Sequence, residues 1–304
     1  MIQVPADGAA EPEERLQARL DHARLRALRF HAEERIRAGG SLDDLRPLIR
    51  PALRTILERA ESPIYQCRLL QMTSVTSSED DTTAANANIA IHSMLMARFL
   101  ALTETELLDV GAAALFHDLW REVSDVAMKT EAGALELLLR SPALSFSNQL
   151  TLLVALDLGR DIRKETAPEI EELPPVSQLV HIADAFERLQ RGSPARAAMS
   201  PRAALELLQG GRSRYMPVLV DLLSDLIGQI PRGSLVKRSN GELALIVEGG
   251  ARQSHKPLAR RLQTADGRPD DELSLVRLDD PLDSLEDVAP ESLPDLDLAA
   301  ALLA

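Results

Sequence analysis

A chain of 304 residues with a formal net charge of −13 is poorly suited to bind a nucleic-acid backbone, which requires clustered Lys and Arg. Aromatic residues make up only 3% of the chain, so Leu, Ala, Val and Ile must build the core, a composition that favours helices. The single cysteine, Cys67, excludes an internal disulfide bond, and we recognise no signal peptide or membrane span, so a cytoplasmic protein is expected.

Most of the chain has the apolar spacing of amphipathic helices. Residues 12–37 have this pattern, which Gly39-Gly40 ends, and Ser41 with Asp44 has the spacing of a capping box for a helix that runs to about residue 59. Further helices are predicted, with approximate bounds, at 63–75, 83–101, 130–140, 146–158, 174–191, 201–209 and 216–229.

Two further helix starts have clear signals. Thr103 with Glu106 forms a second capping box, which opens the helix that leads to His117. Ser200 followed by Pro201 places an N-cap residue before a proline at the first helical position. We therefore expect both helices to begin at these residues.

After Pro231 the pattern changes to that of short strands. Residues 234–237 and 243–247 flank Asn240-Gly241, a strong hairpin signal, and residues 257–263 and 274–278 are predicted to form two more strands. From Asp279 to Asp297 the chain has eight acidic residues and no basic one, which predicts a solvated, mobile tail or, alternatively, a segment that docks on a partner.

These patterns together predict an all-α fold, a helical bundle with a small C-terminal antiparallel β appendage and an acidic tail. The expected parts are an N-terminal helical region (1–79), a helical domain (80–230), the β appendage (231–278) and the flexible tail (279–304). We find no internal repeat.

The most informative motif is the doublet His117-Asp118, at the end of an apolar helix. An imidazole nitrogen and a carboxylate oxygen next to each other can bind one metal ion. Five further segments accompany the doublet. They are Asn88-Ile-Ala-Ile, Ala114-Leu-Phe-His-Asp-Leu-Trp, which contains the doublet itself, Ile182-Ala-Asp-Ala-Phe-Glu-Arg-Leu, Gly233-Ser-Leu-Val and Asn240-Gly-Glu. In this order and spacing, the stretch from about Asp80 to Leu278 resembles the HD-GYP family.

The resemblance implies an HD-domain helical bundle. Members of the family hydrolyse cyclic di-GMP at a site of two or three metals, usually iron or manganese. Registering the motifs without gaps keeps His117, Asp118 and Asp184 as metal ligands. The other ligand positions hold side chains that cannot bind a metal ion, and these are Ala85, Lys129, Ala155 and Leu156.

Other features of the family also change. The GYP signature is absent, and the phosphate-binding lysine after the doublet becomes Arg121, which keeps only the charge. His92 lies about 10 Å along the helix axis from Ala85, too far to replace the lost histidine, and is expected to pack between helices or lie partly exposed. Lys129 offers a cation that could stand in for a lost metal beside Asp118 and Asp184.

The sequence leaves three functions open. The first is a catalytically inactive HD-GYP-like protein that acts by protein–protein interaction in bacterial signalling, for instance that of cyclic di-GMP. This function needs no cofactor, nucleic acid or membrane insertion and is compatible with a homodimer. In such a scaffold, Asp118 would accept hydrogen bonds from His117, Arg121 or Lys129.

The second function is a divergent mononuclear phosphohydrolase acting on a nucleotide or cyclic dinucleotide. Here His117, Asp118 and Asp184 would hold a single iron or manganese ion, and Arg121 would contact phosphate. A bridging-hydroxide mechanism would require a second metal. The third function is a metal-free sensor of cyclic dinucleotides, with the basic segment 160–164 at the phosphates.

Overall fold

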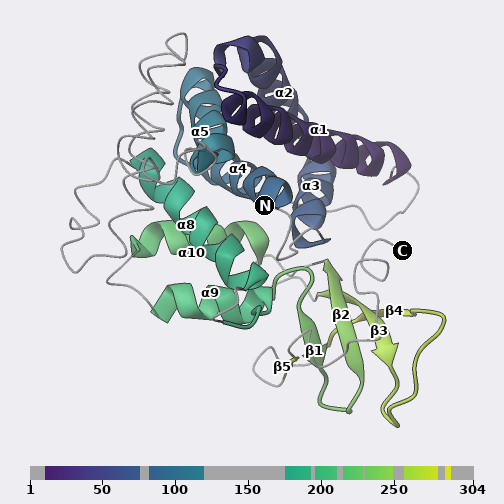
Figure 1. Cartoon of the computed structure of the whole chain (residues 1–304). Helices are drawn as coiled ribbons and strands as arrows, with labels where there is room; N and C mark the ends of the chain where they lie inside the picture. The colour runs from purple at the N-terminus through teal and green to yellow at the C-terminus, as the bar shows by residue number, and fades with distance from the viewer. Residues whose placement is uncertain are drawn as a thin grey trace. The chain divides into compact units, whose positions relative to one another are not determined.

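The computed structural model describes residues 11–75, 82–119, 175–192, 196–210, 215–228, 230–248, 257–279 and 285–288. Within these ranges the chain forms eight α-helices, one short 3-10 helix and one five-stranded sheet (Figure 1). The helices are α1 (Glu11–Arg37), α2 (Arg46–Arg59), α3 (Pro63–Val75), α4 (Thr82–Arg98), α5 (Glu104–Phe116), α8 (Pro175–Arg191), α9 (Pro201–Gly210) and α10 (Pro217–Ile227). The helices predicted at 130–140 and 146–158 lie outside the described residues.

The chain divides into two compact units. The helical unit comprises Met1–Leu69 and Thr82–Asp184, and the second unit, which contains the sheet, comprises Leu70–Asp81 and Ala185–Ala304. None of the helices in the described ranges is long and apolar enough to cross a membrane. The division into four sequence regions stays a prediction.

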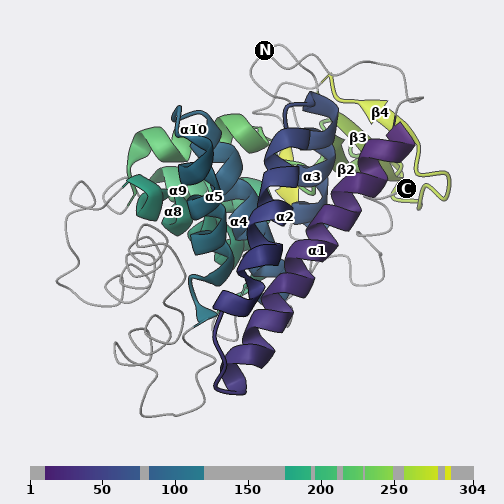
Figure 2. The same ribbon diagram turned by 90° about the horizontal axis from the view of Figure 1, so that it is seen from above.

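The helical unit is arranged around α4 (Figure 2). Every residue of this helix from Ala84 to Ala97 is buried, as expected for a helix whose residues are mainly apolar. Helix α5 returns alongside α4 so closely that a Cβ on Gly111 would lie 2.4 Å from the sulfur of Met94. Glycine and alanine on these two helices therefore set the small distance between them.

The predicted helix starts are confirmed in two cases and corrected in one. The Thr103 hydroxyl accepts from the backbone N–H of Glu106, whose carboxylate accepts from the backbone N–H of Thr103, so this capping box is formed. Ser200 also caps α9, accepting from the backbone N–H of Ala203 at 3.1 Å.

The Ser41 capping box is the prediction that fails. Ser41 accepts from the backbone N–H of Asp43 at 3.0 Å, and a 3-10 turn (Asp43–Leu45) precedes α2. Asp44 forms an ion pair with Arg35. Pro47 lies in the first turn of α2, where its missing N–H does not matter and its fixed φ favours the start of a helix, so α2 begins later than predicted.

The predicted fold class, all-α with a small β appendage and an acidic tail, is wrong. The described residues are 63% helical and 12% strand, and the strands form one antiparallel sheet in the order β4-β3-β2-β1-β5. Its strands are β1 (Leu235–Lys237), β2 (Leu243–Glu248), β3 (Leu258–Gln263), β4 (Leu275–Arg277) and β5 (Glu286–Val288). The first four lie where the sequence predicts strands.

Strand β5 comes from the segment predicted to be a tail. It pairs with β1 in the register Leu235↔Val288, Val236↔Asp287 and Lys237↔Glu286. Two of its three residues are acidic, so no apolar alternation marks it in the sequence. Backbone pairing with an exposed strand edge makes it a strand, and this depends on partners about fifty residues away.

The sheet has its own hydrophobic core, which is why the term appendage does not describe it. Strand β2 is apolar at five consecutive positions, a pattern typical of a strand buried on both faces. One cluster contains Ile230, Val236, Ala244, Ile246, Ala259, Leu278 and Leu285, and the other contains Leu235, Leu243, Leu245, Val247 and Leu262. Leu285, next to β5, completes the first cluster.

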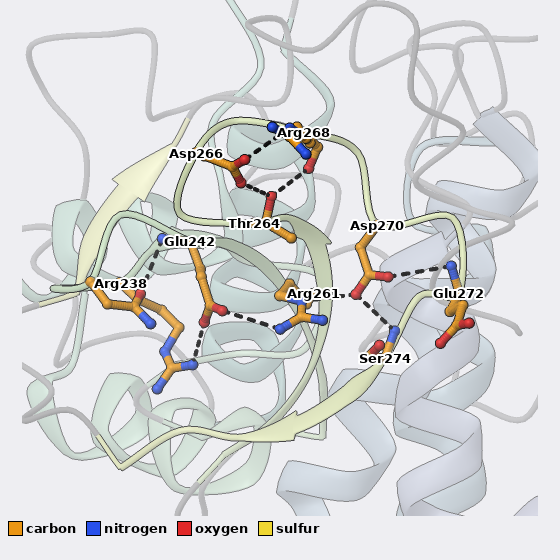
Figure 3. A network of polar contacts seen from close by, with 10 residues as sticks. Arg238, Glu242, Arg261, Thr264, Asp266, Arg268, Asp270, Glu272 and Ser274 are labelled. Carbon is orange, nitrogen blue, oxygen red and sulfur yellow. Dashed lines mark hydrogen bonds and ion pairs between the residues drawn. The ribbon is translucent and has the colours of Figure 1, made fainter.

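A polar network holds the loops at one end of the sheet (Figure 3). Glu242 accepts from Arg238 at 2.6 Å and from Arg261 at 3.2 Å, and Arg261 also donates to Asp270 at 2.8 Å. Asp270 in turn accepts from the backbone N–H of Ser274 at 3.3 Å. These contacts join the β1–β2 hairpin to the loop between β3 and β4.

Candidate functional site

His117 and Asp118 follow directly after α5, in the interior of the helical unit. The capping box at Thr103 fixes where α5 begins, and His117 is its C-cap residue. The His117 residue is 6% exposed, and the Asp118 side chain is 18% exposed. The doublet therefore lies at a defined position with little access to water.

The imidazole of His117 has a contact on each side. Its Nδ1 lies 2.8 Å from the backbone oxygen of Ala114, so Nδ1 donates, because a carbonyl oxygen can only accept. Its Nε2 lies 3.5 Å from a carboxylate oxygen of Asp184 on α8. The structure thus brings together two of the residues that the sequence indicates.

Asp118 faces another part of the unit. One carboxylate oxygen lies 2.9 Å from a terminal nitrogen of Arg29 on α1. The other accepts from the side-chain amide of Asn86 on α4 at 3.4 Å. Helices α1 and α4 therefore each place a polar side chain against this carboxylate.

Arg29 is the centre of this arrangement. Its side chain is only 1% exposed, although arginine is rarely buried so fully. Besides Asp118, the guanidinium donates to Glu33 at 2.8 Å and reaches the backbone oxygen of Leu115 at 3.5 Å. One buried cation therefore lies within ion-pair distance of two carboxylates, which offsets part of the cost of burying it.

The described residues do not fit the two-metal centre of the HD-GYP family. Ala85 is buried in α4 and offers no lone pair. No group of three or more His, Cys, Asp or Glu side chains suited to a metal ion occurs in the described ranges. Because Arg29 already neutralises Asp118, a metal ion there would have to displace a permanently charged guanidinium.

Several other predicted positions lie outside the described residues. These are Arg121, Lys129, Ala155, Leu156 and the basic segment 160–164. The predicted role of Lys129 as a substitute cation therefore stays a prediction, whereas Arg29 is a cation in contact with Asp118.

His92 lies within α4 and is 2% exposed, and burial lowers its pKa to about 4. It packs between helices, one of the two environments expected for it.

Sequence reasoning missed Arg29, Glu33 and Asn86. A signal for the first two was present, because Arg29 and Glu33 are four residues apart on the face of α1 that also carries Leu25, Leu28 and Ala32. A charged pair on an apolar helix face indicates a buried ion pair, but nothing local indicates its third member, Asp118. For Asn86, the signal was an amide within a helix of otherwise mainly apolar residues.

A second polar contact joins the same two helices. His22 on α1 lies 2.9 Å from the side-chain oxygen of Asn88 on α4, and both residues are buried. Helix α1 therefore supplies both the cation at the doublet and a partner for the segment Asn88-Ile-Ala-Ile. The N-terminal helix is part of the site.

No family model, curated protein or solved structure matches this chain.

Proposed function

We propose that this chain is a catalytically inactive HD-GYP-like protein of the bacterial cytoplasm. It acts by protein–protein interaction in signalling, for example in a pathway that uses cyclic di-GMP. The observation that supports this proposal is the buried Arg29 guanidinium at 2.9 Å from Asp118. A cation supplied by the chain itself replaces the charge that a metal would bring to this carboxylate.

The chemistry of arginine makes this substitution permanent. A guanidinium stays protonated at any pH that a protein experiences, so it cannot be removed by titration. Glu33 on the same helix anchors it from the other side at 2.8 Å. Selection for shape without chemistry would keep His117, Asp118 and Asp184 as links between helices α1, α4, α5 and α8.

The alternative is a mononuclear metal-dependent phosphohydrolase, and one distance favours it. His117 Nε2 and Asp184 Oδ1 are 3.5 Å apart, close to the roughly 3.4 Å that separates two ligands on a tetrahedral ion with bonds of about 2.1 Å. These two side chains could share an ion. The third ligand, Asp118, would first have to leave Arg29.

Metal binding distinguishes the two functions. We expect the purified protein to contain no stoichiometric iron, manganese or zinc by mass spectrometry. A chelator should leave the melting temperature unchanged in the wild type and in Asp118→Ala alike, because a protein that holds no metal loses nothing to a chelator. Cyclic di-GMP with added Mn²⁺ should be hydrolysed no faster than by His117→Ala.

The variant Arg29→Met sharpens this experiment. Methionine keeps most of the apolar length of the side chain but frees the Asp118 oxygen that contacts the guanidinium, so Mn²⁺ should bind more tightly to the variant than to the wild type. Stoichiometric metal in the wild type, with stability that the chelator lowers, would move the assignment to the mononuclear enzyme. Turnover lost in His117→Ala would do the same.

A further inference from the structure

Helix α1 carries a second apolar stripe on the face that points away from the helical unit. Leu16, Leu20 and Phe30 are 53%, 53% and 52% exposed, and Ala23 and Ala27 between them are exposed as well. The spacing of these five residues is four, three, four and three. That is the spacing of the a and d positions of a coiled coil.

The opposite face of α1 is the one that the helical unit buries. Ala18, Leu25, Leu28 and Ile36 are at most 5% exposed, and Arg29 lies on this face. In Figure 2, α1 runs along the outer side of α2, α4 and α5. The outward stripe therefore adds nothing to the core of its own unit, and it extends over about 21 Å of helix.

The charges beside the stripe indicate what it binds. Arg19 and Arg26 border one side and Arg24 the other, at the g and e positions that set partner choice in coiled coils. Such a basic border is unusual in a chain with a net charge of −13. A second copy of α1 packed in parallel would place Arg19 opposite Arg24 of the partner helix, so like charges oppose self-association through this face.

We propose that this stripe docks an amphipathic helix of a partner protein whose apolar seam is bordered by Asp and Glu. Leucines of that helix would cover Leu16, Leu20 and Phe30, and its carboxylates would pair with Arg19 and Arg24. The proposal goes beyond the proposed function, because it holds whether or not a metal binds at His117.

Binding of designed peptides to the full chain tests the proposal. The probe is a fluorescein-labelled three-heptad peptide with Leu at a and d and Glu at e and g, and the reference peptide has Lys at e and g. By fluorescence anisotropy, we expect the acidic peptide to bind at least about tenfold more tightly than the basic one. The difference should shrink at high salt.

Variants separate the apolar and charged contributions. The double variant Leu20→Gln/Phe30→Gln should weaken binding of the acidic peptide by about tenfold or more while leaving the melting temperature unchanged, because both residues are exposed. Arg19→Glu/Arg24→Glu should reverse the preference toward the basic peptide. Leu207→Gln, a substitution of a similarly exposed leucine on α9, is the matched control and should change neither.

Three results would overturn the proposal. The first is equal binding of the two peptides, or no binding of either. The second is binding that Leu20→Gln/Phe30→Gln leaves intact. The third is a dimer of the wild type, seen by analytical ultracentrifugation and lost in this variant, which would make a second copy the occupant of the stripe. Each of these outcomes leaves the metal-binding test of the proposed function unaffected.

Discussion

The two polar networks of this protein consist of the same kinds of groups in different surroundings. In the helical unit, Arg29 is 1% exposed and is the central cation between Asp118 and Glu33. In the second unit, Arg261 is 29% exposed and shares Glu242 with Arg238 (Figure 3). A buried charge without its partner has no water to replace it, whereas a charge at the surface does.

The two networks also differ in their links along the chain. Arg238 and Glu242 are four residues apart, Arg261 and Asp270 are nine apart, and Glu242 and Arg261 are nineteen apart, so the pairing of neighbouring strands brings them close. Arg29 and Asp118 are separated by 89 positions and meet only when α1 packs against the end of α5. Removing the central residue of each network should therefore have very different consequences.

The largest effect should follow Arg29→Met. It removes the buried cation that Asp118 and Glu33 share and leaves Glu33 with the more distant Arg37 at 3.7 Å, so the free energy of unfolding should fall by about 3–5 kcal/mol. Urea unfolding followed by the fluorescence of Trp120, the single tryptophan, measures this loss. Arg24→Met, an exposed arginine on the same helix, is the control and should change stability by less than about 0.5 kcal/mol. Equal effects of the two variants would contradict the central role of Arg29.

A smaller effect should appear on acidification of the helical unit. Burial lowers the pKa of His92 from 6.5 to about 4, so the unfolded chain binds a proton in this window that the folded chain does not. Above pH 6.5 this imidazole is neutral in both states and costs the folded state nothing. As the pH falls from 6.5 toward 4, protonation of His92 in the unfolded chain lowers the stability of the fold. Between about pH 7 and pH 5 the loss should be about 2 kcal/mol.

His92→Leu checks this assignment, because it keeps a buried side chain and removes the titration. The stability difference between about pH 7 and pH 5 should shrink in this variant by about 2 kcal/mol, measured again by urea unfolding. An unchanged pH dependence would show that another group titrates there.

The smallest effect should be seen in the sheet. A hydrogen bond with Asn240, together with Arg261 and Arg238, holds the pKa of Glu242 below 4.5. The pKa of Asp270 is held below 3.8, mainly by its hydrogen bond with Arg261. Their stabilising contributions are present above these values and are lost only as the pH falls through the lowered pKa values. Acidification from about pH 7 to pH 5 should therefore leave this network intact.

Glu242→Gln tests the energetic side of the comparison. It should destabilise the sheet by less than roughly 1 kcal/mol, and less again at high salt, because water reaches its partner Arg261, whose side chain is 29% exposed. Hydrogen exchange of the β1–β3 amides, measured by mass spectrometry, reports this change. A loss as large as that of Arg29→Met would mean that burial does not separate the two networks.

Several elements could be predicted from the sequence because their causes are local. Helix α3 begins and ends at the predicted residues, and α9 begins at Pro201, after the predicted cap. The Asn240-Gly241 turn joins β1 and β2 as expected, with Gly241 at a φ of 90°. Apolar period, capping side chains and turn residues each act over a few positions, so the chain itself records them.

Only the tertiary structure decided which distant segments contact one another. Strand β5 exists because β1 offers it an edge, and the sheet is a core in its own right because both faces of β2 are covered. At the candidate site, the sequence indicated His117 and Asp184, but the arginine that faces Asp118 comes from a helix 89 positions earlier. The apolar period of a helix indicates that one of its faces is buried, but not what that face packs against. The partner of a buried charge is therefore decided by packing in three dimensions.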